Sequence, residues 1–362
     1  MTLDRAIVWL MAAFLLLGAF DRCLGGRIGL SGGFAEGIEA MGTLCLSMLG
    51  IMCLAPVLAR LLRPVLVPLY GLFGADAAMF AGTILANDMG GAALAMELAA
   101  TPEAGRFGGL ILGSMLGATL VFILPVALGQ LRPEDRPALA KGILAGIVTI
   151  PAGALAGGLA AGFPVPMLLR NLLPVAALAA LLALGICKWE RATIRVFLLF
   201  GHGVSLLATA GLALAAFSAL TGRTLLPGLL PFEEGLGVVG EIALVLAGAF
   251  PLVQLLTRLL RRPLERLGRA LGINAAAAAG LLASLANVLA MLGLVKDMDE
   301  RGKVVNIAFA TSAAFVFGDH LGFTAAFDAQ MLLPVIVGKL TGGLLAIFAA
   351  LLLTRARPAM GA

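Results

Sequence analysis

Charged side chains are scarce in this chain of 362 residues. Only 12% of its residues are Asp, Glu, Lys or Arg, whereas a soluble protein carries about 25%. Because 61% of the residues are hydrophobic and the mean hydropathy is +1.07, the chain cannot cover itself with a polar surface. This composition excludes an ordinary soluble domain and predicts a helical protein that crosses the lipid bilayer several times.

Histidine, cysteine and the larger aromatic residues are also rare. Two histidines are too few for a dedicated histidine metal site, and the four cysteines show no CxxC spacing and imply no disulfide framework. Two Trp and one Tyr do not support an aromatic cage for a quaternary amine. We therefore expect neither a metal nor a cofactor.

The sequence lacks the common catalytic motifs HExxH and GxSxG, and it lacks the nucleotide-binding motif GxxxxGK[ST]. Two acids in apolar surroundings, Asp88 and Asp319, could form an intramembrane aspartyl pair, but Val316 stands where the GxGD protease signature has its first glycine. The net charge of +5 resides in short loops between apolar runs, which is typical of topology signals. We predict neither an enzyme nor a nucleic-acid-binding protein.

At roughly 20 residues per crossing, the apolar runs predict an all-α polytopic membrane protein with about 10 or 11 transmembrane helices. The run 66–99 is too long for a single crossing. Re-entrant or broken helices are therefore expected near 66–99 and near 272–297. The expected spans are 4–22, 36–62, 66–99, 106–130, 138–162, 166–187, 193–219, 236–260, 275–297, 303–325 and 330–354.

An internal repeat is visible at an offset of 198 residues, where the tetrad RLLR at 60–63 recurs at 258–261. Gly74 and Gly82 recur as Gly272 and Gly280 at the same offset. We expect a single transport domain, 1–362, that contains repeat 1 at about 1–165, a linking helix at about 166–187 and repeat 2 at about 193–354. Repeats of this kind are common in secondary transporters, whose sites lie near the bilayer midplane between the halves.

The strongest functional signal is Asp88, which lies near the middle of an apolar segment beside Asn87 and just before two glycines. A carboxylate at bilayer depth is costly and usually faces a partner charge, a protein interior or a substrate path. The residue could bind a cationic substrate or a proton, or it could form a structural ion pair between helices. At the repeat offset Asp88 falls on Ala286, next to Asn287.

Other polar residues inside apolar runs are secondary candidates. Asp319 and His320 could form a proton relay or gate, because histidine titrates near neutral pH, or they could be an interfacial pair that ends a helix. Asn287 could bind a substrate hydroxyl or simply join helices. Lys339 could pair with an interior acid, but snorkelling to the interface is favoured. Glu36 and Glu39 are interpreted as acids at a helix N-terminus.

Several blocks of the chain resemble the EutH family of bacterial ethanolamine-utilisation membrane proteins. They include MFAGTILANDMGGAALAMELA (79–99), the RGKV loop (301–304) and FVFGDHLGF (315–323), and the resemblance covers nearly the whole chain in order. It implies a multi-pass permease for ethanolamine in the bacterial inner membrane. Only the motif positions Asp88 and Asp319-His320 are carried over as site candidates.

Ethanolamine is a primary amine that is charged at neutral pH, as a lysine ammonium is. Its expected site has a carboxylate for the ammonium and an amide or hydroxyl for its OH group, which Asp88 with Asn87 or Asn287 could supply. The substrate-binding candidates are therefore Asp88, Asn87, Asn287, Asp319 and His320. The alternative is a non-transporting membrane scaffold that anchors the catabolic enzymes, and homo-oligomerisation is left open.

Overall fold

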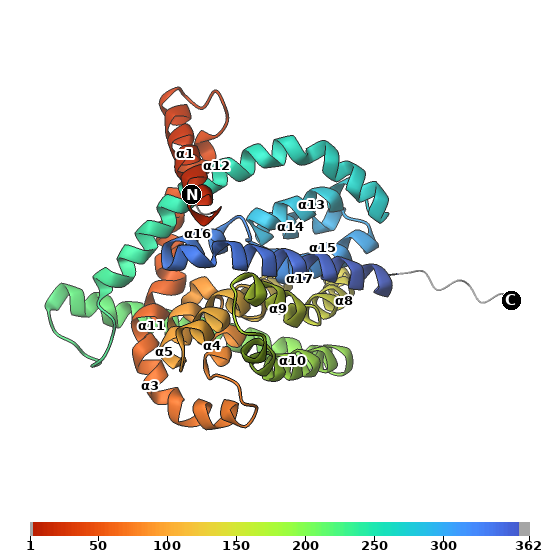
Figure 1. The fold of residues 1–362 in the computed structure, drawn as a ribbon. Helices are drawn as coiled ribbons and strands as arrows, with labels where there is room; N and C mark the ends of the chain where they lie inside the picture. Colours follow the sequence, from red (N-terminus) through yellow and green to blue (C-terminus); the bar gives the residue numbers. More distant parts are fainter. Residues whose placement is uncertain (1–2, 355–362) are drawn as a thin grey trace.

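The computed structural model describes the backbone of residues 3–354 and their side chains except those of residues 3, 4, 190, 191, 194, 257, 260–262, 264, 265, 267 and 269. Within this part of the chain all regular secondary structure is helical (Figure 1). Eight helical segments of the described residues are long and apolar enough to cross a membrane. The protein is therefore an all-α, multi-pass membrane protein, as predicted, although these eight segments are fewer than the 10 or 11 transmembrane helices expected.

The first half begins with a crossing helix and a long, continuous helical segment, followed by two short helices and three further helical stretches. Segments labelled η are π- or 3-10-helical. The elements are α1 (Leu3–Cys23), α2 (Ser31–Leu44), η1 (Cys45–Leu49), α3 (Gly50–Gly71), α4 (Ala78–Ile84), η2 (Asn87–Gly91), α5 (Ala92–Leu98), α6 (Pro102–Arg106), η3 (Phe107–Gly117), η4 (Thr119–Ile123), α7 (Leu124–Gln130), η5 (Pro133–Asp135), α8 (Arg136–Ile147) and α9 (Ile150–Ala160).

A helix near the middle of the chain, α10 (Val165–Lys188), covers the expected apolar span 166–187. Two long helices and two short ones follow, and then three more. The elements are α11 (Glu190–Thr221), α12 (Phe232–Leu271), α13 (Ala275–Ala286), α14 (Val288–Leu294), η6 (Val295–Asp297), α15 (Glu300–Ala313), α16 (Asp319–Asp328), η7 (Ala329–Met331) and α17 (Leu332–Leu353).

Two segments fold back on themselves instead of crossing. We call 78–98 the first hairpin and 275–294 the second hairpin. The arms α4, α5 and α14 have seven residues each, about 10 Å of helix, against an apolar bilayer core of about 30 Å. The expectation of re-entrant or broken helices in 66–99 and 272–297 is met by these hairpins.

Polar side chains close the base of each hairpin. The Asp76 carboxylate accepts hydrogen bonds from the backbone N–H of Ala78 at 2.8 Å and of Ala100 at 2.9 Å, which join the start of α4 to the end of α5. Asn274 does the same for the second hairpin, since its side chain accepts from Ala277 N and donates to Asp297 O. Each closed base fixes the direction in which its hairpin tip points.

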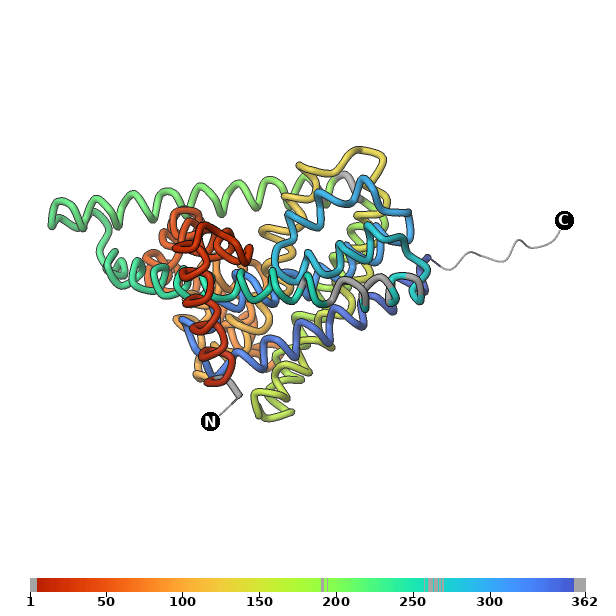
Figure 2. The backbone as a smooth tube through the Cα atoms, turned by 90° about the horizontal axis from the view of Figure 1, so that it is seen from above, coloured from red at the N-terminus to blue at the C-terminus, as the bar shows by residue number. Residues whose placement is uncertain are grey.

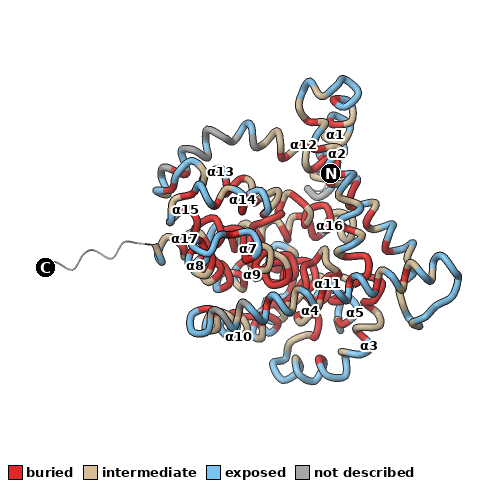
Figure 3. The backbone as a smooth tube through the Cα atoms, turned by 180° about the vertical axis from the view of Figure 1, so that it is seen from behind, coloured by how far each residue is buried: buried red, intermediate tan, exposed pale blue. Residues whose placement is uncertain are grey.

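The hairpins lie within a bundle whose outer layer is formed by long helices. α12 packs along α1 and α2, and α11 packs against α3, while α8, α9, α15 and α17 pack at the centre. Figure 2 shows the long green helix α11 along one edge of the molecule, and Figure 3 shows that buried residues concentrate in the hairpins and central helices. The interior of the bundle thus includes the hairpins, η3, whose residues are all buried, and parts of α8, α9, α15 and α17.

Glycines allow a close helix crossing in this interior, that of α9 and α17. A side chain at Gly153 would lie 2.8 Å from the carbonyl oxygen of Gly338 and from the Cα of Gly342. Such close backbone approach is typical of small residues at membrane helix interfaces. It brings α17, and with it Lys339, next to the hairpins.

Candidate functional site

A cavity of about 350 Å³ lies where the two hairpin tips meet α2, α16 and the segment before α16. We call it the tip cavity. Among the described residues its lining contains four carboxylic acids and no Lys or Arg. It is lined by Glu36, Glu39, Ala40, Thr43, Leu44, Ser47, Ala86, Asp88, Met89, Ala118, Phe122, Phe250, Asn287, Leu289, Phe315, Asp319 and His320.

The first hairpin presents Asp88 to the cavity because its backbone turns there. Leu85 and Ala86 are extended, and the N–H groups of Met89 and Gly91 both donate to the carbonyl of Ala86. Gly90 has φ +84°, and its missing side chain leaves room for Ile51 of α3. A residue with a Cβ would be strained in this conformation and would also press on Ile51.

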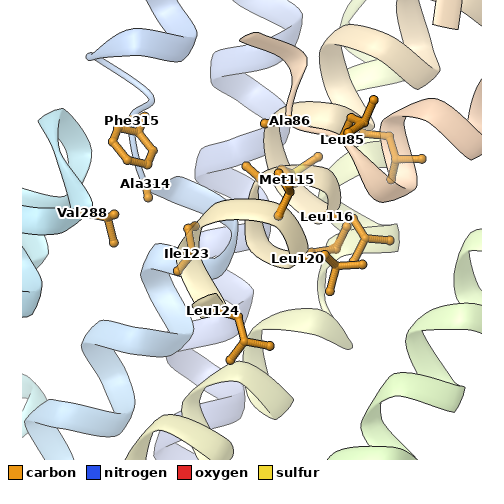
Figure 4. Packing of buried hydrophobic residues seen from close by; sticks show 14 of the residues in the cluster. Leu85, Ala86, Met115, Leu116, Leu120, Ile123, Leu124, Val288, Ala314 and Phe315 are labelled. Carbon is orange, nitrogen blue, oxygen red and sulfur yellow. The ribbon is translucent and has the colours of Figure 1, made fainter. Parts of the chain in front are cut away.

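Buried apolar side chains surround the first tip and fix it. Leu85 and Ala86 pack in one continuous core with Met115 and Leu116 of η3. Figure 4 shows Leu85, Ala86, Met115 and Leu116 near one another, with Phe315 and Val288 toward the opposite side of the view. The tip is therefore held by the packing of Leu85 and Ala86 in this core.

Asp319 and His320 reach the cavity because the helix between 300 and 328 is interrupted at 314–318. Phe315 has φ +62°, and its N–H donates to Ser284 O, while the N–H of Phe317 donates to Leu285 O. The interruption thus pairs with the end of α13, and α16 begins at Asp319. The interpretation of Asp319-His320 as a pair that ends a helix is wrong, since the pair begins one.

The residues Asp88, His320 and Lys339 form a chain of polar contacts from the cavity into the core. His320 Nε2 lies 3.8 Å from Asp88 Oδ1, and His320 Nδ1 lies 2.9 Å from Lys339 Nζ. Lys339 Nζ also donates to Ser114 O at 2.5 Å. Lys339 is 1% exposed and His320 2% exposed, so the contact between these two residues is shielded from solvent.

The burial of Lys339 corrects the expectation that it snorkels to the interface. Its helix, α17, crosses the centre of the bundle, packed on α9 and α15, and the ammonium is held inside by Ser114 and His320. Lys141, which lies 198 positions earlier in the sequence, is exposed on α8.

The two predicted amides are placed differently. Asn287 breaks the second hairpin, with φ −152° and ψ 121°, and its side-chain oxygen accepts from Leu289 N while the residue lines the cavity. Asn87 is fully buried and outside the cavity lining, and neither atom of its amide has a hydrogen-bond partner within the described part of the chain. Asp88, Asn287, Asp319 and His320 are thus brought together, whereas Asn87 lies behind the tip.

Glu36 and Glu39 also belong to the cavity, although they were interpreted as acids at a helix N-terminus. That interpretation is wrong because α2 begins at Ser31, so neither residue lies in its first turn. The sequence carried a signal for them: Glu36, Glu39, Thr43 and Ser47 recur at intervals of three or four residues on an otherwise apolar helix. Such a polar stripe marks the side of a membrane helix that faces a cavity.

Comparison with known proteins identifies the family of this chain. The family model described as ethanolamine utilisation protein, EutH, matches residues 3–353. A protein of Listeria monocytogenes named probable ethanolamine permease EutH is 54% identical over 96% of this chain and 93% of its own length.

Two further relatives cover almost the whole chain. The Salmonella typhimurium protein of the same name is 46% identical over 98% of this chain and 96% of its own length. Bacillus subtilis YxeR, named as uncharacterized, is 49% identical over 99% of this chain and 97% of its own length. No solved structure matches the sequence. On the match to the family model and these identities, the chain belongs to the EutH family.

Proposed function

We propose that this protein carries ethanolamine, as its protonated cation, across the bacterial inner membrane. The names of the Listeria and Salmonella relatives support the substrate and the permease activity. The observation on which the proposal depends is the tip cavity, whose lining has the carboxyl groups of Asp88, Asp319, Glu36 and Glu39 and no Lys or Arg among the described residues. Such a cavity attracts a small cation and repels an anion.

The groups that line the cavity suit both ends of the substrate. A primary ammonium has three N–H donors, and Asp88 with Asp319 can accept them as charge-assisted hydrogen bonds. The substrate hydroxyl needs a neutral polar partner, for which Asn287, Thr43 and Ser47 are available. Since ethanolamine has four heavy atoms, a cavity of about 350 Å³ also holds water around it.

We further propose that the chain arose by duplication, with the site between the halves. The bases of the hairpins support this, since Gly74 and Gly272 both have positive φ, +63° and +69°, and Asp76 and Asn274 follow each glycine by two residues. The chain then continues into α6–η3 after the first hairpin and into α15 after the second. Asp88 and Asn287, one at each tip, would give the site one charged and one neutral side.

The sequence contains no nucleotide-binding motif, so the substrate gradient, the membrane potential or protons would drive transport. An inside-negative potential contributes about 2.3 kcal/mol per 100 mV to the entry of one positive charge. The alternative of a non-transporting scaffold does not account for the cavity, because an anchor has no need to keep acids at membrane depth.

Uptake of labelled ethanolamine by proteoliposomes tests the proposal. The wild-type protein should accumulate label, and Asp88→Asn should lose about 2 kcal/mol of ammonium binding, which is roughly 30-fold in uptake at low substrate concentration. The matched control is Asp297→Asn, an exposed carboxylate outside the cavity, which should transport like wild type. A wild-type protein that moves no ethanolamine would identify a scaffold instead.

A further inference from the structure

Lys339 is the buried group that the transport site described so far does not use. Its ammonium is 1% exposed and contacts Ser114 O and His320 Nδ1. Within the described residues it makes no direct ion pair, and the nearest element of the cavity is His320, whose other ring nitrogen lies 3.8 Å from Asp88 Oδ1. A cation is thus held one imidazole ring away from the carboxylate that faces the cavity.

The contact with Lys339 decides which ring nitrogen of His320 carries hydrogen. A charged lysine has three N–H donors and no acceptor, so Nδ1 must accept from it, and the neutral imidazole then carries its hydrogen on Nε2. In that state His320 presents an N–H donor to the cavity and to Asp88. This donor interacts favourably with the carboxylate and unfavourably with an incoming ammonium.

Loss of one proton from Lys339 reverses this arrangement. A neutral amine can accept from Nδ1–H, so Nε2 becomes a lone-pair acceptor that faces the cavity. The cavity then offers the substrate two neighbouring acceptors, Asp88 Oδ1 and His320 Nε2. The protonation of Lys339 therefore determines whether the wall near Asp88 repels or accepts an ammonium.

We propose that Lys339 is an internal cation that exchanges with the substrate: the binding of one ethanolamine ammonium at Asp88 releases one proton from Lys339 through His320. This inference rests on the proposed function and specifies how its site is coupled to protons. The physical basis is competition. Protonated Lys339 and the bound ammonium are two positive charges near the same carboxylates in a water-poor region, so the binding of one disfavours the other.

The proton transfer is balanced at each atom. Lys339 Nζ gives a proton to His320 Nδ1, and His320 Nε2 gives its own proton to water in the tip cavity, so the imidazole remains neutral and changes tautomer. The charge lost from Lys339 is replaced by the charge of the bound ammonium. The charged and titratable groups that face this path are Asp88 from η2, Asp319 and His320 from α16, and Glu36 and Glu39 from α2.

The first test uses the wild-type protein in detergent and a pH-sensitive dye in weak buffer. Addition of ethanolamine hydrochloride near neutral pH should release about one proton per ethanolamine bound. By linkage, the Kd measured with labelled ethanolamine should rise roughly tenfold for each unit by which the pH falls over the range where the proton is exchanged. Binding without proton release, or a Kd independent of pH between about 6 and 8, would overturn the inference and leave the proposed function intact.

The second test assigns the proton to Lys339. Lys339→Met should bind ethanolamine without proton release and with a Kd that no longer depends on pH, whereas Lys141→Met, the exposed counterpart, should behave like wild type. Lys339→Arg keeps a permanent cation, so this variant should bind ethanolamine weakly and release no proton. It provides the test if Lys339→Met does not fold.

Proton release that persists in Lys339→Met or in Lys339→Arg would assign the proton to a cavity carboxyl and refute the role of Lys339. A wild-type protein that neither binds nor transports ethanolamine would instead refute the proposed function.

Discussion

The base of the first hairpin is the place where one substitution should loosen one half of the site. Asp76 accepts hydrogen bonds from Ala78 N and Ala100 N, which tie the two arms together beneath the tip that carries Asp88. Hydrogen bonds to a charged group contribute about 1.5–3 kcal/mol each, and the partial exposure of Asp76 favours the lower value. Asp76→Ala should therefore cost about 3 kcal/mol, and Asp76→Asn, which keeps one acceptor, about half.

Hydrogen exchange detected by mass spectrometry measures this effect locally. If the loss is confined to the opening of the first hairpin, amides in 78–98 should exchange roughly 100-fold faster in Asp76→Ala and roughly tenfold faster in Asp76→Asn. The second hairpin, 275–294, is the internal control and should exchange as in wild type. Uptake of ethanolamine should fall in the variants whose first hairpin loses protection from hydrogen exchange, because a mobile tip positions Asp88 poorly.

The matching substitution at the base of the second hairpin is Asn274→Ala. Asn274→Ala removes the bonds to Ala277 N and Asp297 O and should loosen the second hairpin alone. Equal loss of protection in both hairpins after either substitution would show that the bases do not act independently. Unchanged exchange in 78–98 after Asp76→Ala would refute the reasoning that these two bonds hold the hairpin closed.

Three further substitutions test the packing around the site by thermal unfolding in detergent. Gly90→Ala should destabilise the protein by about 2 kcal/mol, because Gly90 has a positive φ and an added Cβ would press on Ile51. Gly293→Ala is the control and should be neutral or stabilising, since Gly293 has open space around it. Equal melting temperatures of the two variants would contradict this expectation. Lys303→Met should cost about 2 kcal/mol, because among the described residues the buried Asp135 then keeps only Arg132 as an ion-pair partner. Glu300→Gln changes an exposed partner of the same lysine and should cost no more than ~0.5 kcal/mol. The reverse order of these two losses would refute the assignment. Gly153→Val should separate α9 from α17 and destabilise by about 1–3 kcal/mol, whereas Gly129→Ala, which has no neighbour within 4 Å, is the control.

Much of the fold could be predicted because it depends on properties that are local in the chain. The low charge and the long apolar runs determine a multi-pass helical bundle, since a helix in a bilayer must satisfy its own backbone and match the apolar thickness. The run 66–99, which is too long to cross once, indicated a re-entrant segment. Asp88, Asn287 and Asp319-His320 could be singled out because a polar residue inside an apolar run is exceptional.

Other features of the site depend on contacts between distant residues. Lys339 follows Ser114 by 225 positions, and no local pattern distinguishes its buried ammonium from the exposed one of Lys141. Asn87 is adjacent to Asp88 in the chain, yet the turn at Gly90 places one side chain behind the tip and the other in the cavity. Glu36 and Glu39 lie beyond the first turn of α2, because this helix begins at Ser31, a start that the sequence does not mark.

The sequence alone thus determined the class of protein, the helical elements and the presence of costly polar groups at membrane depth, because all three follow from composition and periodicity. Only the tertiary structure decided which of these groups meet. The energy of a buried charge depends on what lies within a few ångströms of it, and that distance is fixed by hairpins that fold back, a helix that breaks at 314–318 and glycines that let α17 approach. These contacts turn separate polar residues into one cavity with Asp88, His320 and Lys339 in line.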